Sequence, residues 1–213
     1  MLNKRLATAL TASVLVAGTA ACTAPAQTGS AQTAPPAAAA SVSATPSAAA
    51  TASAAGWALN PAAGSQQIKA AGLEVLKAEG TAEHYHAHLD VLVDGKPVTV
   101  PADIGFSFGA GGQPNGISAL HTHDTTGIIH IEAPTPGLKY TLGQVLTEWG
   151  VLDGKDSTGA PHGGTAGWSA YVNGSRQDGP VNEVVLKAHD EIVLSYGAAP
   201  SPVPGTYSFP AGL

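Results

Sequence analysis

The chain has 213 residues, with 9 basic and 15 acidic side chains and a formal net charge of −6 at pH 7. An acidic chain without a basic patch has no means of neutralising phosphates, so we expect no nucleic-acid partner. The sequence contains one cysteine, which excludes an internal disulfide framework.

The first 21 residues predict an export signal. Lys4 and Arg5 precede an apolar run that is too short to span a bilayer as a permanent helix. The cysteine, Cys22, directly follows small residues at the end of this run. This arrangement resembles the lipobox of bacterial lipoproteins, in which that cysteine is lipidated. We therefore expect an exported protein held at the cell membrane by a lipid on Cys22 and facing outside the cytoplasm; secretion with cleavage near residues 24–26 is the alternative.

Residues 22–56 predict a disordered tether. After Cys22 the segment consists almost entirely of Ala, Thr, Ser, Pro, Gln and Gly, with no charged or aromatic side chain. Such a composition buries too little apolar surface to offset the entropy of ordering the chain. Residues 57–213 have the length of a single globular domain, with a possible subdivision near residue 118.

The first histidine cluster follows the period of a β-strand. Side chains alternate between the two faces of a strand, so four polar residues share one face: His84, His86, His88 and Asp90. The intervening residues are mostly apolar and can pack into a core. Asp94-Gly95 then predicts a hairpin turn, and Pro97 predicts that the returning strand lies at an edge or a bulge.

The second cluster predicts a β-hairpin over residues 120–132. A loop at residues 124–127 begins with Asp124 and ends with a glycine, as hairpin loops often do. Pairing His123 with residue 128 places His121 opposite His130, and cross-strand partners share a face with β-carbons about 5 Å apart. Glu132 lies on the same face as His130, whereas the isoleucines at 129 and 131 point to the other side.

The remaining elements predict an α+β fold with mixed and antiparallel sheets, β-hairpins and two helices. We expect an amphipathic helix over residues 66–79, a mobile glycine-rich loop over residues 106–117, a capped helix between Thr141 and Gly150, and strands over residues 168–173 and 191–196. A hairpin, a helix and two strands in this order make the C-terminal half resemble a β-grasp, the ubiquitin-like arrangement. Tyr207 and Phe209 are expected to hold the C-terminal tail against the domain.

The histidine face predicts a transition-metal site, with zinc or copper as the ion. Neutral imidazole suits both ions. The expected ligands are His121, His123 and His130, with His84, His86 and His88 completing this site or forming a second one. Three carboxylates, Asp124, Glu132 and Asp90, are expected to orient the imidazoles or to bind directly. Met1 and Cys22 are the sulfur-containing residues and lie outside the domain, which excludes a blue-copper centre.

Three function classes remain open on the sequence. A site closed by protein ligands would sense, buffer or deliver metal, whereas an open coordination position would support a metal-dependent oxidoreductase or hydrolase. The HxH pair followed by a later His and Glu faintly resembles cupin dioxygenases, although this Glu follows the third His. A metal-free β-grasp module that binds a partner protein is the third alternative.

Several motifs resemble an uncharacterised family of exported bacterial and archaeal proteins. The likeness extends over residues 84–150, with a weaker match over 171–207. It is carried by His86-Ala87-His88-Leu89, Pro101-Ala102-Asp103-Ile104-Gly105, His121-Thr122-His123-Asp124, Gly127-Ile128-Ile129-His130-Ile131-Glu132 and Thr141-Leu142-Gly143-Gln144. The resemblance implies export and a common role for the histidine motifs, and it supplies no reaction.

Overall fold

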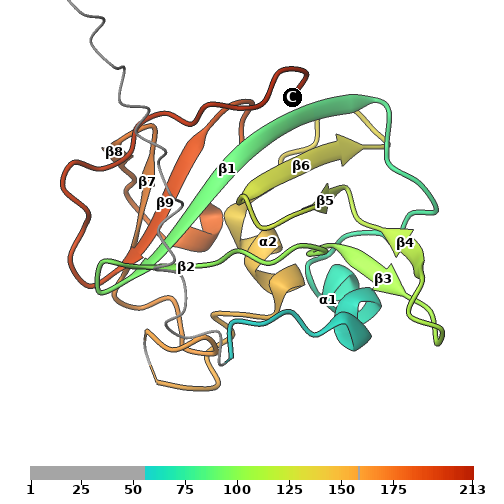
Figure 1. Ribbon diagram of the computed structural model, residues 1–213, viewed down its shortest axis with the longest axis horizontal. Coiled ribbons are helices and arrows are strands. Elements are labelled where there is room, and N and C mark those ends of the chain that lie inside the picture. Colours follow the sequence, from blue (N-terminus) through green and yellow to red (C-terminus); the bar gives the residue numbers. More distant parts are fainter. Residues whose placement is uncertain (1–55, 158) are drawn as a thin grey trace, which may run out of the picture. The chain divides into compact units, whose positions relative to one another are not determined.

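The computed structural model describes residues 56–157 and 159–213 (Figure 1). In chain order the elements are η1 (Pro61–Ala63), α1 (Gly64–Ala70), β1 (Glu83–Val93), β2 (Lys96–Val98), β3 (Phe106–Phe108), β4 (Pro114–Ile117), β5 (Leu120–His121), β6 (Ile128–Ala133), α2 (Leu142–Trp149), β7 (Trp168–Val172), β8 (Ser175–Arg176), η2 (Val181–Glu183) and β9 (Glu191–Tyr196).

One mixed sheet organises the domain. Its strands run in the order β5-β6-β1-β9-β7-β8, and β2 pairs with β1 at one end. The pair β1 and β9 is parallel, whereas β1 and β6, β5 and β6, and β7 and β9 are antiparallel. The predicted α+β class is confirmed. Strands on both sides of residue 118, from β1 to β9, lie in the same sheet.

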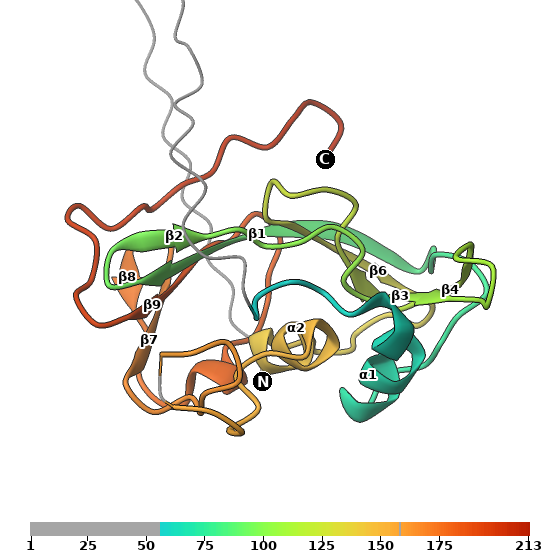
Figure 2. The ribbon, with the colours of Figure 1, turned by 60° about the horizontal axis from the view of Figure 1, so that its bottom comes forward.

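The two faces of the sheet have different chemistry. The face that carries Ala87, Leu89 and Ile129 packs with α2 into one apolar core, which also contains the three tryptophans. Figure 2 shows α2 on one side of the sheet and the C-terminal tail on the other. Because side chains alternate along a strand, the histidines of β1 and β6 lie on the face opposite the core.

The predicted turn and helix-capping residues are confirmed at several positions. Thr141 and Gln144 form the capping box of α2, and Gly150 ends this helix in the left-handed conformation. Asp94 and Gly95 both have positive φ in the hairpin between β1 and β2. Pro97 lies on β2, which pairs with β1 alone. The tail is also held as predicted, since Tyr207 stacks on His88 and Phe209 stacks on His189.

Two predicted elements are wrong. The helix expected over residues 66–79 ends at Ala70, because Gly72 adopts the left-handed conformation and Leu73 N–H bonds back to the Ile68 carbonyl. The glycine-rich segment at 106–117 forms the hairpin β3–β4. It pairs further with Leu76 through Ile117, and a β-carbon at Gly116 would lie 2.4 Å from Val75 Cγ1, so glycine serves here for close packing.

The predicted signal, the lipidated Cys22 and the tether to residue 55 lie outside the described residues. Within residues 56–157 and 159–213, we find no helix with the length and apolar composition needed to cross a bilayer.

A buried carboxyl group lies in α2. The Glu148 side chain is fully buried, and neither of its oxygens has a hydrogen-bond partner by geometry within the described part of the chain. Burial raises its pKa to about 8, against a smaller opposing effect of Ser118. Glu148 therefore holds a proton in the folded state at neutral pH.

We predict that Glu148→Gln stabilises the fold increasingly as the pH rises. The folded-state pKa lies above the ordinary value of 4.5, so the wild-type chain loses stability between pH 4.5 and 8 by up to about 1.4 kcal/mol per pH unit. The amide side chain of the Glu148→Gln variant does not titrate in this pH range. Denaturant titrations at pH 5, 6.5 and 8 should show a growing difference from wild type, absent for the exposed Glu74→Gln; a pH-independent difference would contradict this.

Candidate metal centre

Strand pairing brings the two histidine clusters together. In the register of β1 and β6, His86 lies opposite His130 and His84 lies opposite Glu132. On the other side of β6, His121 of β5 also lies opposite His130, which is the predicted hairpin register. The central row of the site therefore runs across three neighbouring strands.

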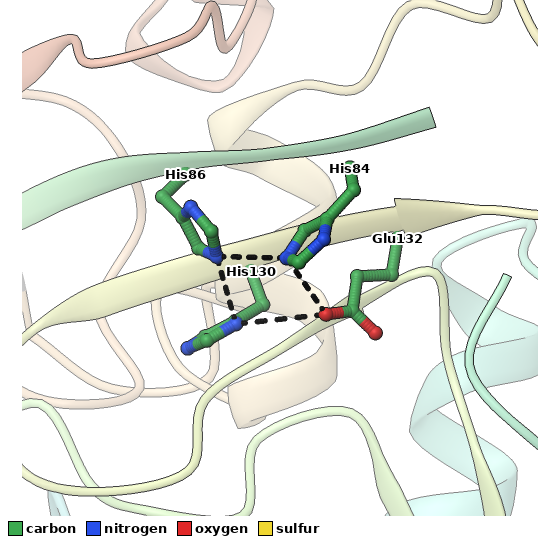
Figure 3. A group of neighbouring side chains, drawn as sticks. All are labelled: His84, His86, His130 and Glu132. Carbon is green, nitrogen blue, oxygen red and sulfur yellow. Dashed lines mark hydrogen bonds and ion pairs between the residues drawn. The ribbon is translucent and has the colours of Figure 1, made fainter. Parts of the chain in front are cut away.

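Four donor atoms converge in the first group, which we call the inner donor set: His84 Nε2, His86 Nε2, His130 Nδ1 and Glu132 Oε1 (Figure 3). His86 Nε2 lies 3.1 Å from His84 Nε2 and 3.1 Å from His130 Nδ1. Glu132 Oε1 lies 3.1 Å from His84 Nε2 and 3.8 Å from His130 Nδ1. Glu132 is thus one of the converging donors and not merely an acceptor behind a histidine.

His121 presents a free lone pair to the same region. Its Nδ1 lies 3.1 Å from the Ser118 carbonyl oxygen. Since a carbonyl can only accept, Nδ1 carries the proton and Nε2 is unprotonated in the neutral ring. The ring is fully buried, and Nε2 has no hydrogen-bond partner among the described residues. Fixing one ring nitrogen on a backbone carbonyl is how proteins prepare the other nitrogen for a metal.

The buried imidazoles are held in their neutral form. Burial lowers the pKa of His121 to about 3 and that of His130 to about 4, and neighbouring histidines add to both effects. Burial, followed by His84, also lowers the pKa of His86. For Glu132, burial and then Glu79 raise the pKa. Neutral imidazole is the form that binds a metal, so His86, His121 and His130 need not lose a proton at pH 7.

A second group of donors lies beside the inner donor set. His123 Nε2 lies 3.7 Å from Glu79 Oε1, and both side chains are nearly half exposed. The ring of His123 lies close to those of His121 and His130, and the three could hold one ion between them. Phe106 packs against His121 and His123 with ring centroids 5.7 Å away in each case.

His88 lies apart from the other histidines, in a separate group with Asp90 and Glu191. It lies on the same face of β1, but its Nδ1 is 2.8 Å from Glu191 Oε2 and its Nε2 is 2.8 Å from the Thr126 carbonyl oxygen. Both acceptors require an N–H, and Glu191 raises the His88 pKa against the effect of burial, which is the largest contribution. With both nitrogens donating, the ring has no lone pair for a metal, although His88, Asp90 and Glu191 lie close enough together to hold an ion if a proton leaves. His88 instead links β9 to the loop between β5 and β6.

Two of the three predicted carboxylates also lie elsewhere. Asp90 groups with His88 and Glu191, and not with the inner donor set. Asp124 accepts hydrogen bonds from the backbone N–H, at 2.8 Å, and the hydroxyl of Thr126. It therefore shapes the hairpin loop, as short polar side chains commonly do in turns.

Sequence reasoning missed two contributors to the site. Glu79 was assigned to a helix, so its approach to His123 and Glu132 was not foreseen. Ser118 contributes a backbone carbonyl, which carries no side-chain signal in a sequence. A pattern of histidines identifies ligands on regular strands, but not the loop groups that fold over them.

We predict that the metal-free protein loses stability in acid through His121. Its folded-state pKa of about 3 lies below the ordinary value of 6.5. The stability that the neutral ring contributes is therefore complete above pH 6.5. It is lost as the pH falls from 6.5 towards 3, by about 1.4 kcal/mol per pH unit. In chelator, the free energy of unfolding of His121→Leu should fall less steeply between pH 7 and 5 than that of wild type. Equal slopes would show that the ring is not a buried neutral group.

Comparisons with known proteins leave the site to be interpreted from its own geometry. No family model, no curated protein and no solved structure matches the chain. The resemblance to exported proteins therefore stays a prediction from the motifs. What the structure shows is groups of histidine and glutamate side chains placed to hold a metal ion.

Proposed function

We propose that the protein is an extracytoplasmic, membrane-anchored metal-binding protein that holds zinc on its histidine face for sensing, buffering or delivery. The observation that carries this proposal is the convergence of four donor atoms in the inner donor set. The anchor and the export rest on the sequence around Cys22.

The donor types suit zinc, which binds imidazole nitrogen and carboxylate oxygen. A tetrahedral zinc ion with bonds of about 2.0–2.1 Å holds neighbouring ligand atoms about 3.3–3.4 Å apart. The four contacts around the inner donor set measure 3.1, 3.1, 3.1 and 3.8 Å, close to this separation. Three imidazoles and one carboxylate also give a site closed by protein ligands, as expected for holding an ion.

Without a cation the arrangement leaves hydrogen-bonding needs unmet. His86 Nε2 faces two other ring nitrogens at 3.1 Å, and it can donate or accept along one direction at a time. His121 Nε2 is buried without a partner in the described part of the chain. A polar group buried without a partner costs about 1–3 kcal/mol. A bound ion would satisfy the converging lone pairs together.

The first experiment measures the zinc content and zinc affinity of the purified full-length chain carrying Cys22→Ser, which removes the thiol as a ligand. We predict retention of zinc through purification and a higher melting temperature on adding Zn²⁺ to the chelated protein. Zinc at 100 times its Kd should add about 2.7 kcal/mol to the free energy of unfolding. His86→Asn should weaken the tight site by more than the roughly 10–100-fold caused by loss of a ligand's hydrogen-bond partner.

The control is His162→Asn, which removes a histidine that pairs with Asp153 outside the site. It should bind zinc like the parent chain. Two outcomes would contradict the proposal: no retained metal with no thermal shift for any divalent ion, or equal zinc affinity in His86→Asn and its parent.

A further inference from the structure

The two carboxylate oxygens of Glu132 face different groups of donors. Oε1 belongs to the inner donor set, where it approaches His84 and His130. Oε2 lies 4.0 Å from His121 Nε2, and His121 does not belong to the inner donor set. A carboxylate whose oxygens face separate groups of donors is suited to bridge two cations.

The donors around Oε2 form a set of their own. Ligand atoms of Glu79, His121 and Glu132 all lie within 4.8 Å of one another, as do those of His121, His123 and His130. Two donors on one ion with bonds of about 2.1 Å lie at most about 4.2 Å apart. The contacts of 4.0 Å between His121 and Glu132 and 3.7 Å between His123 and Glu79 fall within this limit.

His121 gives this set a ligand that the fold already holds in position. Its side chain is fully buried, Ser118 fixes its tautomer, and its unpartnered Nε2 lies among these carboxylates. The inner donor set already has four donors from other residues, so it leaves this lone pair unused. The buried nitrogen is an observation independent of the acidic pair.

We propose that the histidine face has a second cation position, held by His121 Nε2, Glu132 Oε2 and Glu79 with His123 beside it, so that two transition-metal ions share Glu132. The inference rests on the proposed function, because the inner donor set supplies the first ion. The side chains of His123 and Glu79 are 44% and 49% exposed. Water therefore completes the coordination of the second ion.

Solvent reaches both positions, the inner one past His84, whose side chain is 54% exposed, and the second past His123 and Glu79. The shared carboxylate couples the two positions, since each ion withdraws electron density from the oxygens that bind the other.

The test is a Zn²⁺ titration of the full-length Cys22→Ser chain by calorimetry, with native mass spectrometry to count ions. We expect two ions per chain in two resolved events. Glu79→Gln and His123→Asn, both at exposed positions, should weaken the second event by more than about 10-fold and leave the first within about threefold, a change of about 0.7 kcal/mol. Glu74→Gln, an exposed glutamate away from the donors, is the matched control and should change neither event.

Loading with Cu²⁺ gives an independent readout. Two bridged copper ions should broaden or diminish the electron paramagnetic resonance signal as the second equivalent is added, and Glu79→Gln should prevent this change. Saturation at one Zn²⁺ that depends on His86, with Glu79→Gln indistinguishable from its parent, would overturn the second position and leave the proposed function standing. No binding of Zn²⁺ at all would overturn both.

Discussion

The site depends on the antiparallel register between β1 and β6. This register sets His86 opposite His130 and His84 opposite Glu132, and it does so because the alternate residues of both strands are buried against α2. A slip of one residue would turn the histidines into the core and the isoleucines to the other face. Burial of the apolar face therefore fixes the positions of the donors, and the metal site is a consequence of the core.

Burial also sets the protonation state of the ligands. Removing His121 and His130 from water holds their pKa values at about 3 and about 4, far below neutral pH. In the metal-free protein this burial lowers the free energy of unfolding and leaves lone pairs without partners. The same environment favours a metal over protons, since zinc need not displace protons from these rings at pH 7. His88 shows the opposite case, because Glu191 and a carbonyl keep both of its nitrogens protonated.

The period of the strands was readable from the sequence, and with it the pairing of His121 with His130, the capped helix α2, the hairpin at Asp94-Gly95 and the aromatic contacts of the tail. The segments between regular elements were not. Gly72 ended a helix that the apolar spacing extended to residue 79, and this hid Glu79. His88 has the same spacing as His84 and His86, but Glu191 lies more than a hundred residues away in sequence. Tertiary partners of this kind decide whether a histidine binds a metal or a proton.

The most direct measurement is anomalous X-ray diffraction at the zinc edge from crystals of the zinc-loaded protein. We expect an ion about 2.0–2.1 Å from His84 Nε2, His86 Nε2, His130 Nδ1 and a Glu132 oxygen. An anomalous peak away from these atoms, or none in a fully loaded crystal, would contradict the central claim that the inner donor set is a zinc site.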